Sequence, residues 1–124
     1  MIKLNLGSGN RPIPHYINVD IDCSCEPDQV QDVCTLPLTK NNSVDVIYCS
    51  HIVEHFPRLQ VPIILKRWYE VLKSGGILRI SVPDFDAICR HYIIHKDYDI
   101  LKGLLYGSQL NEYHFHKSGW DFET

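Results

Sequence analysis

Two small groups of residues in this chain could bind or transform a small molecule, and both follow predicted strands. In the first group, the turn made by Gly7, Ser8 and Gly9 follows the apolar strand Lys3–Leu6, and Asp20 comes at the end of the next strand. Glycines let a ligand approach the backbone closely, and a carboxylate at a strand end accepts hydrogen bonds from ribose hydroxyls. The pattern is typical of a nucleoside site, although the glycines could also serve only a tight turn.

The residues after the glycines restrict which nucleoside the site can hold. In a dinucleotide site, the glycine turn opens a full helix whose N-terminus binds the pyrophosphate. Here Pro12 and Pro14 limit any helix to about one turn, and the sequence has no Gly-Lys-Ser/Thr phosphate loop. The sequence therefore favours a nucleoside without phosphates and disfavours a dinucleotide-dependent oxidoreductase.

The second group follows the predicted strand Val44–Cys49 and consists of His51, Glu54 and His55. On a helical turn, residues four apart share a face, so His51 and His55 can point in the same direction. Imidazole titrates near neutral pH, so either histidine is a candidate general base. The alternative is structural: Glu54 would pair with Arg11 and tie the glycine turn to this segment, while His55 would cap or pack.

Two further clusters resemble metal ligands, but a metal site is the less favoured interpretation of each: the cysteine spacing is unusual, and the histidines could simply lie on a surface loop. Cys23, Cys25 and Cys34 are close in sequence, yet Cys-x-Cys without a matching second pair is not the usual zinc arrangement. His114 and His116 alternate, so on an extended segment they would face the same side. An odd number of cysteines also argues against a disulfide framework. We therefore expect reduced thiols and no metal site.

These residues need a scaffold of short strands and amphipathic helices. Apolar and β-branched runs predict strands over Lys3–Leu6, Tyr16–Val19, Gln29–Val33, Val44–Cys49 and Ile77–Val82. Helices are predicted over Leu59–Lys73, from Asp84 onward, and over Tyr98–Tyr106. The first helix is expected to pack through Leu65, Trp68, Tyr69 and Leu72. Alternating strands and helices predict an α/β fold with a mostly parallel sheet of about five strands and shortened first crossovers.

The composition is that of one globular domain spanning residues 1–124, and it excludes several classes of partner. The formal net charge is −3 without a Lys/Arg cluster, which gives no support for nucleic-acid binding. The longest apolar runs, such as Val61–Leu65, are far shorter than the roughly 20 residues of a membrane-spanning helix. The N-terminus is a strand rather than a signal peptide, so we expect a cytoplasmic protein without membrane partners.

Four segments together resemble the class I S-adenosylmethionine-dependent methyltransferases, of the small, type 11-like kind with a shortened first crossover. They are Leu4–Gly9, Asn18–Asp20, Asp45–His55 and Val71–Asp84, in the order typical of the family. The resemblance implies a Rossmann-like sheet in the order 3-2-1-4-5 and S-adenosylmethionine as the cofactor. It implies methyl transfer to a small-molecule or glycan-type acceptor; the alternative is a protein that binds S-adenosylmethionine or S-adenosylhomocysteine without transferring the methyl group.

The resemblance also implies roles for individual residues in cofactor binding. The turn Gly7–Gly9 would pass under the amino acid part of the cofactor, and Asp20 would bind the ribose hydroxyls. Asp32 would meet the amino group of the adenine, with the backbone amide of Val33 beside the ring. Each of these residues lies at or after the end of a predicted strand, which is the edge where open α/β sheets bind ligands.

Two more implications concern the catalytic end of the site and the open edge of the sheet. Ser50 and His51 would lie near the sulfonium and its methyl group, and Gln109–Trp120 would cover the acceptor pocket. The family sheet has seven strands, whereas five are predicted here, so the strand Ile77–Val82 would lie at an edge. An apolar edge strand invites pairing, so we expect either coverage by Tyr98–Thr124 or a homodimer.

Overall fold

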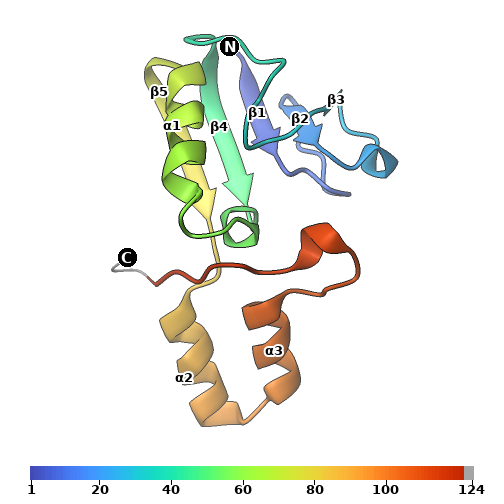
Figure 1. Cartoon of the computed structure of the whole chain (residues 1–124), viewed down its shortest axis with the longest axis vertical. Coiled ribbons are helices and arrows are strands. Elements are labelled where there is room, and N and C mark those ends of the chain that lie inside the picture. Colours follow the sequence, from blue (N-terminus) through green and yellow to red (C-terminus); the bar gives the residue numbers. More distant parts are fainter. Residues whose placement is uncertain (122–124) are drawn as a thin grey trace.

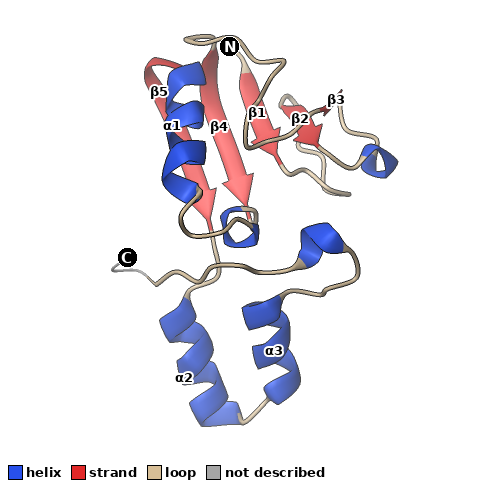
Figure 2. Ribbon diagram, viewed as in Figure 1, coloured by secondary structure: helices blue, strands red, loops and turns tan. Residues whose placement is uncertain are grey.

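The structure, a computed structural model that describes residues 1–121, is a parallel sheet with helices on one face and at one end (Figures 1 and 2). The strands are β1 (Lys3–Leu6), β2 (Ile17–Asp20), β3 (Gln29–Val30), β4 (Val44–Ser50) and β5 (Leu72–Ser81). The α-helices are α1 (Val61–Val71), α2 (Phe85–His95) and α3 (Tyr98–Tyr106), and the 3-10 turns are η1 (Cys23–Cys25), η2 (Val53–His55) and η3 (Glu112–His114). All neighbouring strands pair in parallel in the order β3-β2-β1-β4-β5, which confirms the predicted α/β class and strand order.

The first crossovers are short, and a polar network takes the place of a packed helix there. The connection from β1 to β2 spans residues 7–16 without a helix, although parallel strands usually need a longer one. The Asn18 backbone N–H and side-chain amide both donate to Asp28 Oδ2, at 2.7 and 2.8 Å. Asn18 Oδ1 accepts from Asn5 Nδ2 at 2.9 Å and from the Ile13 amide at 2.8 Å. This network fixes the loop after β1 and leaves the carboxyl ends of β1 and β2 uncovered by a helix.

Helix α1 lies over β4 and β5 and supplies much of the core (Figure 1). Its buried residues are Val61, Ile64, Trp68 and Val71. Trp68 is fully buried, and its indole N–H donates to the Val33 carbonyl at 2.8 Å, which ties α1 to the segment after β3. The predicted inner face was wrong at Tyr69, which is 77% exposed. Trp68 and Leu72 are buried as predicted, and Leu65 is partly buried against the core. Ile64, on the neighbouring stripe, is buried in place of Tyr69.

Two predicted strand boundaries were also wrong. Strand β5 begins at Leu72 rather than at Ile77, with a bulge that places Val44 opposite Leu72 and Val46 opposite Ile77. Lys73 therefore does not complete a helix; its Nζ lies 2.9 Å from Asp45 Oδ1 on β4. Strand β3 ends at Val30 instead of Val33, because the chain turns there into the segment that Trp68 holds.

Helices α2 and α3 form a hairpin beyond the carboxyl ends of the strands, and the chain then returns between this hairpin and the sheet (Figure 1). A parallel bridge between Asp84 and Trp120 anchors the returning segment at the start of α2. Among the described residues, β5 pairs only with β4, and its Ile77 and Ile80 are 48% and 42% exposed. The expected coverage of the β5 edge by the C-terminal segment is thus not found within residues 1–121. No helix in this described part is long and apolar enough to cross a membrane.

Candidate active site

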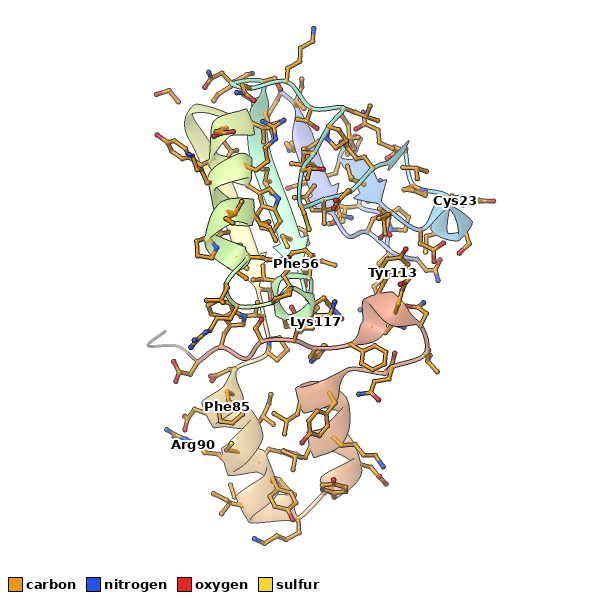
Figure 3. All side chains as sticks on the ribbon, in the orientation of Figure 1. Cys23, Phe56, Phe85, Arg90, Tyr113 and Lys117 are labelled. Carbon is orange, nitrogen blue, oxygen red and sulfur yellow. The ribbon has the colours of Figure 1, made fainter. Side chains whose placement is uncertain are left out.

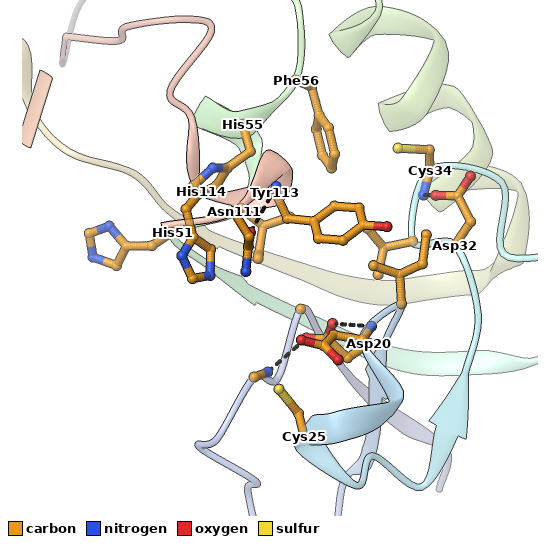
Figure 4. Close-up of a pocket in the computed structure, with 16 residues that line it drawn as sticks. Asp20, Cys25, Asp32, Cys34, His51, His55, Phe56, Asn111, Tyr113 and His114 are labelled. Atoms are coloured by element: carbon orange, nitrogen blue, oxygen red, sulfur yellow. Dashed lines mark hydrogen bonds between the residues drawn. The ribbon is translucent and has the colours of Figure 1, made fainter. Parts of the chain in front are cut away.

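A cavity of about 410 Å³ opens at the carboxyl end of the sheet, beside the point where the strand order reverses between β1 and β4 (Figure 4). Open α/β sheets bind ligands at this point, and small-molecule pockets typically measure about 300–1,000 Å³. The lining comes from the β1 and β2 ends (Gly7, Gly9, Asp20, Ile21, Asp22, Cys25), the segment after β3 (Asp32, Val33, Cys34), the turn after β4 (His51, Ile52, His55, Phe56) and the C-terminal segment (Asn111, Tyr113, His114).

The glycine turn is fixed by the strand beside it. The amides of Gly7 and Ser8 both donate to the Val19 carbonyl, at 2.8 and 3.1 Å. The Gly9 amide donates to Asp20 Oδ2 at 2.8 Å, while the Asp22 amide donates to Oδ1 at 2.9 Å (Figure 4). Each carboxylate oxygen has a second lone pair. Asp20 thus holds the turn in place and keeps acceptor capacity on the cavity side.

A second carboxylate, Asp32, lines the cavity from the segment after β3. Asp32 Oδ1 accepts from the Cys34 amide at 2.8 Å. Val33 between them offers its carbonyl to Trp68, so the segment is fixed by a buried side chain of α1. Burial, and next the charge of Asp32, raise the pKa of the Cys34 thiol to about 12. Burial likewise raises the pKa of Cys49 to about 12.

These pKa shifts predict the order in which the thiols react. Thiols react as thiolates, and a pKa raised to about 12 leaves Cys34 and Cys49 protonated at pH 8. We expect iodoacetamide at pH 8 to modify first Cys23, which is exposed at the edge of the molecule (Figure 3), and to leave Cys34 unmodified although it lines the cavity. Peptide mass spectrometry after timed quenching measures the rates, with guanidinium-unfolded protein as the control. Equal rates at Cys34 and Cys23 in the folded protein would contradict the burial described here.

His51 and Glu54 form a hydrogen-bonded pair at the end of β4. His51 has a positive φ of 56°, and its amide donates to the Ser81 carbonyl on β5. Its Nδ1 lies 3.1 Å from Oε1 of Glu54, whose side chain is almost completely buried. The Glu54 carbonyl accepts from the amides of Lys117 and Ser118, which holds the C-terminal segment against this turn. The alternative pairing of Glu54 with Arg11 is wrong: among the described residues, the carboxylate's bonded partner is His51.

His55 lines the same cavity but has a different set of partners. Its Nδ1 lies 3.1 Å from the Phe115 carbonyl, and its ring meets that of His116 edge to face at 4.8 Å between centroids. Desolvation lowers the pKa of His55, so its neutral form is favoured. The structure thus brings His51 and His55 to one cavity, as their spacing predicted, but through a bend and a 3-10 turn rather than an α-helix.

The C-terminal segment closes the far side of the cavity. Figure 4 shows Tyr113 reaching from this segment across the cavity toward Asp32, with Phe56 above its ring in this view and Asp20 below it. His114 also lines the cavity and lies 3.0 Å from the Ser108 hydroxyl, whereas His116 Nδ1 lies 2.8 Å from the Leu104 carbonyl. The expectation that both histidines face the same side was wrong, because the 3-10 turn η3 ends at His114.

Most of the predicted cofactor residues line the cavity, and two do not. Gly7, Gly9, Asp20, Asp32, Val33 and His51 are among the lining residues. Within residues 1–121, Ser8 and Ser50 are not; Ser8 is buried, and Ser50 pairs with Ser81 inside the sheet. Sequence reasoning missed Phe56, which carries no local signal; it considered Cys25 only as a metal ligand and Tyr113 only as part of a polar and aromatic stretch.

Comparisons with known proteins agree with this fold. A family model described as "Methyltransferase domain" matches residues 13–80, which is more than half of the chain. Among solved structures, the fold is similar to one titled "DhpI-SAM-HEP complex", with a TM-score of 0.54 and 16% sequence identity. That match covers 77% of this chain and 51% of the other, so the chain spans about half the length of that structure. No curated protein matches the sequence.

The chain therefore belongs to the methyltransferase domain family. Its five parallel strands have the order of the class I S-adenosylmethionine-dependent methyltransferases, which confirms the resemblance seen in the sequence.

Proposed function

We propose that this chain binds S-adenosylmethionine in the 410 Å³ cavity and transfers its methyl group to a small-molecule or glycan-type acceptor. The observation that carries the proposal is the placement of two kinds of group on opposite sides of one cavity. The carboxylates of Asp20 and Asp32 follow β2 and β3, and the imidazoles of His51 and His55 follow β4. The carboxylates are suited to binding the nucleoside of the cofactor, and the imidazoles on the other side are suited to accepting a proton.

The residues present fit the cofactor. Gly9 has a positive φ of 47°, and a Cβ built on it would meet nothing within 4 Å, so the backbone can be approached closely. The free lone pairs of Asp20 are suited to the ribose hydroxyls, and Asp32 is suited to an amino group on the base. Phe56 and Tyr113 supply aromatic surface on the same cavity.

His51 has the partner that a general base needs. The Glu54 carboxylate accepts from His51 Nδ1, which orients the ring and leaves Nε2 with a lone pair. S-adenosylmethionine supplies an already activated methyl group, so the protein has to align the acceptor and accept its proton. In this role, His51 Nε2 takes the proton of an acceptor hydroxyl.

Calorimetry and product detection test the proposal. The wild type should bind S-adenosylmethionine and release S-adenosylhomocysteine when a panel of hydroxylated small molecules and glycans is offered. His51→Ala should slow turnover by about 10²–10⁴-fold, the usual contribution of a general base, while His95→Ala on α2 serves as the matched control. Absence of S-adenosylmethionine binding by the wild type would overturn the proposal. Binding without product from any acceptor would favour a binding protein without transferase activity.

The exposed β5 edge also supports a proposed homodimer. Strand β5 carries the exposed apolar residues Ile77, Leu78 and Ile80, and such an edge pairs readily. We expect light scattering to give the mass of a dimer and the β5 amides to exchange slowly. A monomer with rapidly exchanging β5 amides would overturn this part of the proposal and leave the cofactor site unaffected.

A further inference from the structure

Glu54 carries a carboxylate oxygen that the proposed methyl transfer does not use. Its side chain is 1% exposed, and while Oε1 bonds to His51, Oε2 has no hydrogen-bond partner within residues 1–121. A buried carboxylate oxygen is unfavourable unless a proton, a water molecule or a cation satisfies it. The unpaired Oε2 therefore indicates a ligand that the described side chains do not supply.

Two histidines lie against this carboxylate. One oxygen of Glu54, one ring nitrogen of His55 and one of His116 all lie within 4.8 Å of one another. They come from the turn after β4 and from the C-terminal segment, which the Glu54 carbonyl holds together. Two imidazoles and one carboxylate form a ligand set that binds Zn²⁺ or Fe²⁺ and leaves further coordination positions open.

Hydrogen bonds fix both imidazoles in the tautomer that such a site needs. Nδ1 of His55 lies 3.1 Å from the Phe115 carbonyl, and Nδ1 of His116 lies 2.8 Å from the Leu104 carbonyl. A carbonyl oxygen only accepts, so Nδ1 carries the proton in both rings and Nε2 keeps its lone pair. Metal-binding histidines almost always donate their other N–H in this way, because the bond orients the ring and raises its basicity.

A small cavity adjoins the cluster. It measures about 20 Å³ and is lined by Glu54, His116 and Trp120, among others. About 10–15 Å³ is enough for one water molecule. Within the described part of the chain, the buried Trp120 Nε1 has no acceptor, and an indole N–H can only donate. It is therefore suited to donating to a water molecule held by a cation.

We propose that Glu54, His55 and His116 bind one divalent transition cation, such as Zn²⁺, Co²⁺ or Fe²⁺. Mg²⁺ fits this set less well, because it prefers oxygen ligands. His55 also lines the large cavity, so an open coordination position can face the acceptor. This step rests on the proposed methyl transfer: a cation whose open position faces the acceptor would bind an oxygen atom of the acceptor. The acceptor would then be an oxygen nucleophile.

The site can be tested with cobalt on the whole chain. Protein freed of metal with a chelator is titrated with Co²⁺, and binding is followed by calorimetry and by visible absorption. We expect one equivalent to bind with a spectrum typical of nitrogen and oxygen ligands, without the charge-transfer bands of cobalt thiolates. His116→Ala should weaken binding by more than about 100-fold, since losing only a hydrogen-bond partner of a ligand costs about 10–100-fold. His114→Ala, in the same segment but outside the cluster, is the matched control and should bind as the wild type does.

A second variant separates a metal ligand from a structural residue. Glu54→Gln keeps the shape of the side chain and an oxygen for His51, so it should fold, as thermal unfolding will show, yet bind Co²⁺ at least about tenfold more weakly. His116→Ala should retain S-adenosylmethionine binding, because His116 does not line the large cavity. The metal site is overturned if the wild type binds no Co²⁺, if the spectrum shows thiolate ligands, or if His116→Ala binds as the wild type does. If the wild type binds Co²⁺ but does not bind S-adenosylmethionine, the proposed function is overturned and the metal site is not.

Discussion

Replacing Asp20 by alanine is expected to weaken S-adenosylmethionine binding by about 10- to 150-fold. Hydrogen bonds to a charged group contribute about 1.5–3 kcal/mol, and each 1.4 kcal/mol changes a dissociation constant about tenfold. Asp20 lines the cavity and keeps one lone pair on each oxygen after binding the Gly9 and Asp22 amides. Calorimetry of the variant and the wild type under the same conditions gives the ratio of dissociation constants.

Two controls separate the lost contact from a disturbed glycine turn. Asp45→Ala removes a carboxylate at the opposite end of the sheet, where β4 begins and Lys73 is its partner, and should leave the affinity unchanged. Asp20→Asn keeps an oxygen that can accept from the Gly9 amide, so the turn should persist while the second acceptor for ribose is lost. Affinities equal to the wild type in both Asp20 variants would place the ribose elsewhere and contradict the assigned role.

The sequence predicted the parts of this fold that depend on neighbouring residues. Strand β1, the shortened crossover after Gly9, and helices α2 and α3 follow from local runs, prolines and an N-cap at Asp84, which accepts from the amides of Asp86 and Ala87. The cavity followed from one more rule, that parallel strands bring their carboxyl ends to the same edge of the sheet. Asp20, Asp32 and His51 therefore meet there as expected.

The remaining features depend on contacts between distant segments, which no local pattern specifies. Apolar residues at both Leu65 and Ile64 allow two helix faces; in the structure Ile64 is buried, whereas Leu65 is only partly buried against the core. Charge suggested Arg11 as the partner of Glu54, but the carboxylate bonds to His51, and the Glu54 carbonyl holds the amides of the distant Lys117 and Ser118. The same long-range contact brings His116 to His55. The spacing of residues in the sequence could therefore not predict this set of metal ligands, because its members come from distant segments.

Gly7→Ala is expected to lower the free energy of unfolding by about 2–5 kcal/mol. Gly7 has a φ of 66°, and a Cβ there would lie 2.0 Å from Ile52 Cδ1 and 2.4 Å from its Cγ1. A left-handed backbone costs a residue with a Cβ about 1–2 kcal/mol, and overpacking costs about 1–3 kcal/mol more. The β-branched Ile52 has few alternative rotamers with which to withdraw. Urea unfolding of the variant and the wild type measures the difference.

The expected loss in the free energy of unfolding has a contribution from the backbone and one from packing, and two further variants separate them. Gly9 also has a positive φ, but a Cβ there would meet nothing within 4 Å, so Gly9→Ala should cost only the backbone part, about 1–2 kcal/mol. Ile52→Ala removes both clashing atoms, so the double variant with Gly7→Ala should be more stable than the sum of the single losses predicts, by about 1–3 kcal/mol. If instead Gly7→Ala costs no more than Gly9→Ala, or if the double variant is additive, Ile52 does not pack against the glycine turn. In that case the close approach of the β4 turn to the cofactor loop, on which the shape of the cavity depends, would be wrong.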